Sequence, residues 1–229
     1  MKKKNYFLVC LLACSSSVWA DSSAIDKVYH PYVQPLEQEI EYRMISADDE
    51  MAYRLGLGKS FSDRLFMELY LTGSDKKKQG DPDIDSYELE AKWQLTEQGE
   101  YSADWGVIVE LEKQKSVAAW ELSTGLLVEK EWRKWSGTAN FWAIYEWGDR
   151  PDDEFESVLA LQARYRYSRF FEPAIEFYSG EQTRGIGPVA LGELRFGKGR
   201  KLKWEMGAII GLDAKTPDTT WRFLTEFEF

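Results

Sequence analysis

The chain has 229 residues, a formal net charge of −10, and 15% aromatic residues that include ten tryptophans. This acidic balance excludes a general nucleic-acid binder, whose surface would be basic, and it disfavours attraction to anionic lipid. The mean hydropathy is negative, which argues against a bundle of membrane helices. Membrane β-barrels remain possible, because their strands alternate apolar and polar residues.

The N-terminus has the features of a cleavable export signal. Three lysines at residues 2–4 precede a short apolar run, and Val18-Trp19-Ala20 offers the small residues that a signal peptidase reads. We therefore predict a signal peptide over residues 1–20, with the mature chain beginning at Asp21. A rival reading is a lipoprotein signal, in which Leu11-Leu12-Ala13-Cys14 would leave a lipid anchor on Cys14.

Both cysteines, Cys10 and Cys14, lie in this signal, so the mature chain offers no disulfide or thiolate metal site. Residues 21–35 follow it and contain Pro31 and Pro35 without any repeating pattern, which predicts an irregular segment. This segment could be a periplasmic tail, or it could fold into the mouth of a barrel. The sequence favours neither position.

From residue 36 onward, apolar and polar residues alternate in runs divided by turn residues, as in β-strands. The predicted strands are 36–44, 53–58, 65–71, 87–95, 103–112, 120–129, 139–147, 159–167, 175–178, 190–196, 202–212 and 221–229. Many approach the roughly 9–11 residues that a tilted strand needs to cross a membrane. Connecting segments tend to alternate between long and short, as when periplasmic turns are short and outer loops are long.

The two faces of these predicted strands differ in charge. The apolar face of every run carries no Asp, Glu, Lys or Arg, whereas the opposite face holds nearly all of them. An uncharged face can contact lipid, where a charge near the bilayer midplane would cost about 2–4 kcal/mol. A soluble β-sandwich would alternate in the same way. The strand lengths, the even strand number and the rhythm of the connections favour the barrel.

The last predicted strand, residues 221–229, ends the chain on Phe229. Its Trp and Phe residues share one face with Thr225. An exposed aromatic strand edge invites aggregation in water, but in lipid it can close a barrel by pairing with the first strand. The strand resembles the C-terminal recognition strand of bacterial outer-membrane barrels. It predicts the barrel-assembly machinery as a partner, through Phe229.

These observations predict an all-β fold, a transmembrane antiparallel up-and-down β-barrel over residues 36–229. We expect about 12 strands, within a range of about 10–14. The mature chain also resembles an uncharacterised proteobacterial family of small outer-membrane β-barrel proteins. The residues that carry this resemblance are His30-Pro31-Tyr32-Val33, Glu39-Ile40-Glu41-Tyr42-Arg43, Phe171-Glu172-Pro173, Gly185-Ile186-Gly187-Pro188-Val189 and the C-terminal strand. The resemblance implies fold and location, and no activity.

The charged face is expected to line the lumen, with more acids than bases. The candidate lumen-facing residues are Glu39, Glu41, Arg43, Arg54, Glu68, Glu88, Glu90, Lys92, Glu110, Glu121, Arg164, Arg166, Glu193, Arg195, Lys203, Glu205, Arg222 and Glu226. Carboxylates in a narrow passage select cations by their field. The alternative is a set of salt bridges that only keeps a polar interior soluble.

Enzymatic and metal chemistry find little support in the sequence. Nucleophilic catalysis needs a general base near neutral pKa, and the single histidine, His30, precedes the first strand, where we read it as a tail or turn residue. Asp81, Asp83 and Asp85 alternate in a polar stretch but lack the calcium-loop spacing of an EF-hand. We expect no catalytic residues, no metal site and no cofactor.

The predicted function is a narrow passive channel for small solutes, with a preference for cations, in the outer membrane of a Gram-negative cell. The alternative is a sealed structural or surface-interaction barrel without transport. We expect the protein to be surrounded by outer-membrane lipid and lipopolysaccharide. We also expect it to be a monomer and to have no nucleic-acid partner. A barrel of 12 strands lies between small barrels that side chains fill and large porins with open channels, so size does not decide between the two functions.

Overall fold

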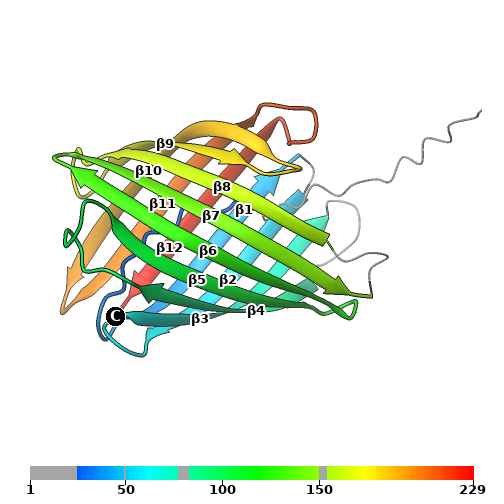
Figure 1. Cartoon of the computed structure of the whole chain (residues 1–229), viewed down its shortest axis with the longest axis horizontal. Coiled ribbons are helices and arrows are strands. Elements are labelled where there is room, and N and C mark those ends of the chain that lie inside the picture. The colour runs from blue at the N-terminus through cyan, green and yellow to red at the C-terminus, as the bar shows by residue number, and fades with distance from the viewer. Residues whose placement is uncertain (1–24, 49, 77–82, 150–153) are drawn as a thin grey trace, which may run out of the picture.

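The computed structural model describes residues 25–48, 50–76, 83–149 and 154–229, which contain twelve strands and no helix that could cross a membrane. The strands are β1 (Gln38–Ala47), β2 (Glu50–Ser60), β3 (Leu65–Lys76), β4 (Asp83–Gln94), β5 (Asp104–Gln114), β6 (Ala119–Trp132), β7 (Trp135–Gly148), β8 (Glu154–Tyr165), β9 (Glu172–Ser179), β10 (Arg184–Gly197), β11 (Arg200–Gly211) and β12 (Thr219–Glu228). Each pairs with its sequence neighbours, and β12 pairs with β1 to close the barrel (Figure 1). The predicted fold class and the strand number are confirmed.

Strand ends differ from the sequence pattern in places. β1 begins at Gln38 rather than at Leu36, because Leu36 has a positive φ of 63°, which is incompatible with an extended strand. The polar stretch between the predicted strands 65–71 and 87–95 is partly strand, since β3 continues to Lys76 and β4 starts at Asp83. Asp83 and Asp85 therefore belong to β4, while Asp81 lies outside the described residues.

The two ends of the barrel are distinguished by their connections. We call the end with residues 61–64, 95–103, 133–134, 166–171 and 198–199 the turn end, and the opposite end the loop end. Lys198 and Gly199 both have positive φ and join paired residues Gly197 and Arg200, as a type I′ hairpin requires. The predicted alternation of short and long connections is imperfect, because residues 95–103 form a long connection at the turn end.

The outer surface of the barrel is apolar. Side chains such as Leu57, Leu89, Phe141, Met206 and Trp221 point outward and are exposed, whereas the acids and bases between them in sequence point inward. This segregation follows from the two-residue period of a strand and matches the predicted faces. An exposed apolar surface that surrounds the whole barrel suits a hydrocarbon environment and would aggregate in water.

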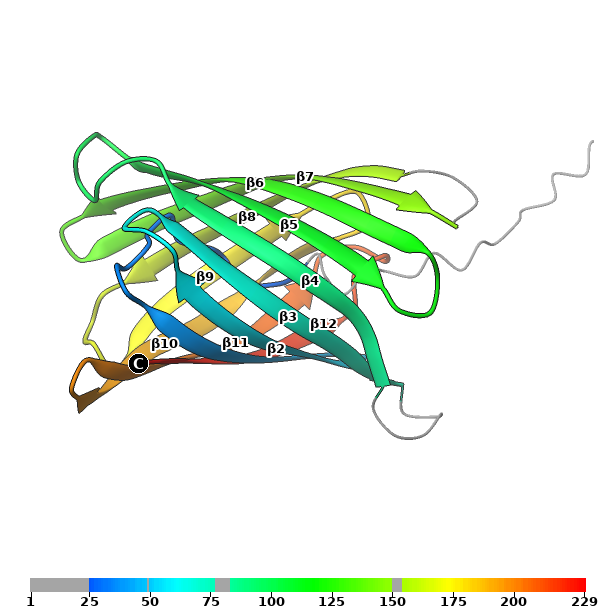
Figure 2. The same ribbon diagram turned by 90° about the horizontal axis from the view of Figure 1, so that it is seen from below.

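Residues 25–33 lie inside the barrel, and the exposed residues 34–36 lead from it to β1. The segment starts toward the loop end, runs through the lumen and reaches the turn end, where β1 begins (Figures 1 and 2). We call residues 25–37 the lumen segment. The sequence left open whether this stretch is a tail or folds inward, and the structure places it between the barrel walls.

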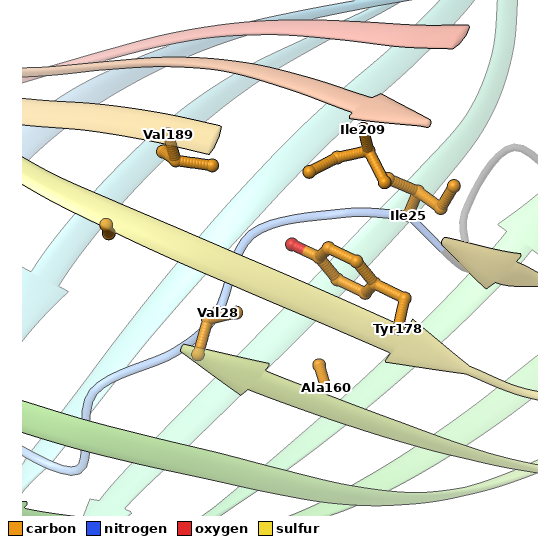
Figure 3. Packing of buried hydrophobic residues seen from close by; sticks show 7 residues of the cluster. Ile25, Val28, Ala160, Tyr178, Val189 and Ile209 are labelled. Atoms are coloured by element: carbon orange, nitrogen blue, oxygen red, sulfur yellow. The ribbon is translucent and has the colours of Figure 1, made fainter. Parts of the chain in front are cut away.

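Apolar contacts hold the first part of the lumen segment. Ile25 and Val28 pack against Tyr178, Val189 and Ile209 on the inner faces of β9, β10 and β11 (Figure 3). A separate cluster holds Tyr29 against Ile108 and Leu127, with its ring edge-on to Trp142 at 5.6 Å between centroids. A mostly charged lumen thus contains two apolar patches, and the segment covers both of them.

One glycine of the wall allows the lumen segment to approach closely. A side chain at Gly106 on β5 would put its Cβ 3.0 Å from both Cα and Cβ of Pro31. That distance is tighter than ordinary van der Waals contact between such atoms. The absence of a side chain at Gly106 therefore gives Pro31 room to lie against the wall.

Candidate functional site: the lumen and its inner segment

Asp26 ties together strands from different parts of the wall. Its carboxylate accepts hydrogen bonds from Arg43 on β1 and, at 3.1 Å, from Arg54 on β2. Its main-chain oxygen accepts a hydrogen bond from the Tyr178 hydroxyl at 2.6 Å and another from Arg222. This one residue therefore connects β1 and β2 with β9 and β12 across the lumen.

The charges of Asp26 and Lys27 are stabilised by these neighbours. Burial alone would raise the pKa of Asp26, but the Arg43 and Arg54 guanidinium groups outweigh it and lower the pKa to about 2. Burial would lower the pKa of Lys27, but the attraction of Glu41 outweighs it and raises that pKa. Lys27 pairs with Glu41 and, at 3.4 Å, with Glu226. Both ions are thus held charged inside the barrel.

The middle of the segment is fixed through its backbone. Asn140, fully buried on β7, accepts a hydrogen bond from the Tyr29 amide at 2.7 Å and donates one to the Tyr29 carbonyl at 2.8 Å. This pairing imitates a β-ladder with a side-chain amide. It satisfies main-chain groups that an irregular segment otherwise leaves open.

The remainder of the segment is bonded to the turn end. The Tyr32 hydroxyl donates to Asp104 at 2.8 Å, and the Val33 amide donates to Gln94 at 2.8 Å. Gln34 accepts from Lys201 of β11 at 2.8 Å and, through its carbonyl, from the Ser60 hydroxyl at 2.5 Å. The segment is therefore bonded along its whole described length.

His30 does not behave as the tail or turn residue that we predicted. Its Nδ1 lies 2.5 Å from a carboxylate oxygen of Glu129 on β6, inside the lumen. The nearby Ser136 hydroxyl donates to Glu129 at 2.6 Å. Nucleophilic catalysis requires a hydrogen bond between the hydroxyl and the histidine, and here both groups bond to the carboxylate instead. The arrangement fits a structural contact of the segment.

Strand register lines up the inward carboxylates into two rows. In the first row, Glu228 faces Glu39 across β12 and β1, and Glu68, Glu90 and Glu110 face one another in turn across β3, β4 and β5. Like charges placed directly opposite on neighbouring strands repel each other. Such a row needs cations, protons or basic side chains to neutralise it.

The second row lies one step toward the loop end. Its members that face one another directly in the register are Glu226 with Glu41, and then Glu88, Glu112, Glu121, Glu146 and Glu154 across β4 to β8. The carboxylates of β4 to β8 are thus adjacent in space although they are far apart in sequence. We call these two sets the first and second carboxylate rows.

The basic residues of the later strands form salt bridges with acids. Arg222 pairs with Glu176 at 2.8 Å and with Glu205, and Arg195 pairs with Glu193 at 2.5 Å. Lys203 pairs with Glu226 at 3.1 Å and with Glu228 at 2.6 Å. Charge on the wall made by β8 to β12 is therefore largely balanced, and the excess of acid lies on the earlier strands.

The lumen segment leaves free space in the barrel. A cavity of about 690 Å³ is lined on one side by the segment from Lys27 to Glu37 and on the other by Lys92, Arg164 and Lys203, among others. A smaller cavity of about 60 Å³ lies among Asp26, Tyr29, Glu88, Glu110, Glu121 and Trp142. Lys27 and Tyr29 line both cavities, so the segment lies between these two spaces.

Most of the candidate lumen-facing residues are shielded from solvent. Those that are buried are Glu39, Glu41, Arg43, Glu68, Glu88, Glu90, Glu205 and Arg222. Those that are partly buried are Arg54, Lys92, Glu110, Glu121, Arg164, Arg166, Glu193, Lys203 and Glu226, while Arg195 is exposed. Sequence reasoning missed Asp26 and Lys27. The clue was the presence of Ile25, Val28 and Val33 in a stretch otherwise read as a tail.

Comparison with known proteins yields structural neighbours only. No family model matches the chain, and no curated protein does. Membership of the uncharacterised family that the sequence resembles therefore remains a prediction.

Among solved structures, the KdgM porin is 14% identical, with a TM-score of 0.57 over 83% of this chain and 99% of that one. The COG4313 outer membrane channel from Pseudomonas putida F1 is 13% identical, with a TM-score of 0.59 over 87% and 97%. The NanC porin is 5% identical, with a TM-score of 0.57 over 84% and 98%. At such identities the comparison establishes a shared barrel fold.

Proposed function

We propose that this protein is an outer-membrane, porin-like passive channel for small solutes, whose lumen is narrowed by residues 25–37. The observation that carries the proposal is a closed barrel with an apolar exterior whose charged interior still encloses a cavity of about 690 Å³. Apolar exteriors of this kind contact lipid, and a polar interior with free space offers solutes a wet path. The porins and the outer membrane channel among its structural neighbours support the same reading.

We further propose that the channel prefers cations. The carboxylate rows place acids side by side across β3 to β8, and the bases of the late strands are engaged with their own acids. A passage lined by excess carboxylate attracts cations and repels anions. One neighbour, KdgM, is described in complex with an oligogalacturonate. The acidic wall of this chain argues against a polyanion as its own solute.

The sealed barrel is the second candidate, and the lumen segment favours it. Asp26, Lys27, Tyr29 and Tyr32 bond to opposite parts of the wall, and such anchors could close the passage. In both candidates we propose a monomer without catalytic activity, exported by a signal peptide over residues 1–20. Lipopolysaccharide would surround it, the barrel-assembly machinery would engage it at Phe229, and its turn end would face the periplasm.

Planar-bilayer recording of the refolded mature protein under a KCl gradient tests the proposal. Discrete conductance steps with a cation-selective reversal potential are expected. Glu112→Gln with Glu121→Gln should reduce the selectivity, because these adjacent members of the second row lose their charge. Glu193→Gln is the matched control, since Glu193 pairs with Arg195 and faces Lys203 across the strands rather than another carboxylate.

The outcomes separate the two candidates. Folded protein that migrates differently on gels after heating, yet passes no current, would contradict the channel and support the sealed barrel. Conductance with an anion-selective reversal potential would leave the channel standing and contradict the role assigned to the carboxylate rows.

A further inference from the structure

Three carboxylates of the lumen lie at the spacing of ligands to one ion. Glu88 and Glu90 on β4 and Glu110 on β5 each place one oxygen within 4.8 Å of the oxygens of the other two. Two oxygens that each bind one Ca²⁺ at about 2.4 Å can be at most about 4.8 Å apart. Glu90 and Glu110 also face each other directly in the register, so the strands themselves fix this approach.

The cluster contains a buried carboxylate oxygen that has no partner. Glu90 is 1% exposed, and its Oε2 forms no hydrogen bond with any described residue. A buried anion that is neither bonded nor paired is costly, and proteins relieve this cost by pairing it, by protonating it or by coordinating a metal. Within the described residues, no cationic side chain lies within salt-bridge distance of Glu90, so this oxygen has room for a further counter-charge.

Two bases near the cluster, Arg54 and Lys27, are engaged with other acids. Arg54 bonds to Glu88 and to Asp26 at 3.1 Å, and Lys27 bonds to Glu41 and Glu226. Within the described parts of the chain, Glu88 thus forms a salt bridge, whereas neither Glu90 nor Glu110 has a cation within salt-bridge distance. The three carboxylates with one guanidinium keep an excess of negative charge that one divalent cation would balance.

Space for an ion and its waters adjoins the cluster. Glu88 and Glu110 line the cavity of about 60 Å³, together with Asp26, Tyr29 and Trp142. A single water needs about 10–15 Å³ of cavity volume, so this cavity has room for a few water molecules. Ca²⁺ takes six to eight oxygen ligands in flexible geometry and accepts water among them.

We propose that Glu88, Glu90 and Glu110 bind a divalent cation in the lumen, with Ca²⁺ preferred over Mg²⁺. Mg²⁺ requires shorter bonds and near-ideal octahedral geometry and gives up its waters reluctantly, which a site on two rigid strands accommodates poorly. Binding does not depend on conduction, because the site would form equally in a sealed barrel. The bound ion would neutralise the wall next to the lumen segment.

Calcium titration of the refolded mature protein in a zwitterionic detergent tests this site, because no lipid headgroup then competes for the ion. After chelator treatment, isothermal titration at pH 7.5 should show one saturable Ca²⁺ site per chain and at least tenfold weaker Mg²⁺ binding. Tb³⁺ in its place should luminesce on excitation of the protein, since Tyr29 and Trp142 line the adjoining cavity.

Glu90→Gln with Glu110→Gln keeps the shape of both side chains and removes both charges. This pair of changes should weaken Ca²⁺ binding at least tenfold and abolish the Tb³⁺ signal. Glu193→Gln, which removes a paired inward carboxylate elsewhere, should change neither. The change in gel mobility on heating confirms that each variant is folded, and Glu110→Gln alone replaces the double variant if the latter fails to fold.

Two results would overturn the proposal. One is folded wild-type protein without a saturable Ca²⁺ site, as expected if protons neutralise the carboxylates instead. The other is Ca²⁺ affinity that the glutamine variants leave unchanged, which would place the ion elsewhere. The first result is measured on the wild-type protein alone and does not require a folded variant.

Discussion

The side chain of Asn140 forms hydrogen bonds with both the amide and the carbonyl of Tyr29. This relationship joins the middle of β7 to an irregular segment that lies 111 residues earlier in the chain. The Tyr29 ring packs beside the contact, against Ile108 and Leu127. The Asn140 side chain is therefore one of the anchors that hold the lumen segment.

Replacement of Asn140 by leucine should loosen the lumen segment. The change leaves a buried amide and a buried carbonyl unpaired, at a cost of roughly 1–3 kcal/mol for each group. Trypsin should then cleave after Lys27, whose side chain is only 11% exposed in the docked segment, at least tenfold faster. Mass spectrometry of the N-terminus measures the rate.

Gln162→Leu provides the matched control for that experiment. Gln162 is also a buried amide of the wall, but it donates to Glu176 on the neighbouring strand and not to the segment. An equal acceleration of cleavage in both variants would mean that the Asn140 contact has no particular role in holding the segment.

Asp26 should make the fold sensitive to acid. Its pKa of about 2 lies below the ordinary value of 3.8. The ionised carboxylate therefore stabilises the folded state fully above pH 4, and this stabilisation is lost as the pH falls from 4 toward 2. The shift corresponds to about 2 kcal/mol. The Asp26→Asn variant should unfold at a lower temperature than wild type at pH 6, and the difference should shrink at pH 3. A gap that is equal at both values would contradict the assignment.

Glu37 should have the opposite pH dependence. Burial and a hydrogen bond with Glu228 raise its pKa from 4.5 to about 7, so its protonated form favours the folded state. That contribution is complete below pH 4.5 and is lost as the pH rises through 7. Glu37→Gln should match wild type at pH 5 and exceed its stability at pH 8, by about 1–2 kcal/mol given partial exposure. Thermal unfolding of both proteins at pH 5 and pH 8 measures this difference, and an equal difference at the two pH values would contradict the prediction.

The outward face of β4 should reject charge. Leu89 is 44% exposed on the outer surface, near the middle of its strand. Leu89→Arg should cost about 2–4 kcal/mol of folding free energy in lipid, because the charge would meet hydrocarbon. Tyr167→Arg, in the connection at the turn end, should cost at most about 1 kcal/mol. Urea titration in vesicles compares them, and equal costs would place both positions in water.

The alternation of residues along the chain was enough to predict the barrel. A strand has a period of two residues, so the alternation in runs such as 87–95 and 221–229 assigned each side chain to a face without any knowledge of its neighbours. The aromatic residues up to Phe229 likewise predicted a closing strand, and β12 does pair with β1. Strand ends were less accurate, as at Leu36, because backbone conformation there depends on the turn.

Which partners the inward residues face could not be predicted, because it depends on how distant strands are aligned. Alternation shows that Glu90 and Glu110 point inward, but their direct opposition depends on the register between β4 and β5, which is a relation between two segments. The position of residues 25–37 depends still more on context. Asp26, Lys27 and Tyr29 carry no periodic pattern, and their place in the lumen follows from bonds to Arg43, Glu41 and Asn140, which only a closed barrel brings together.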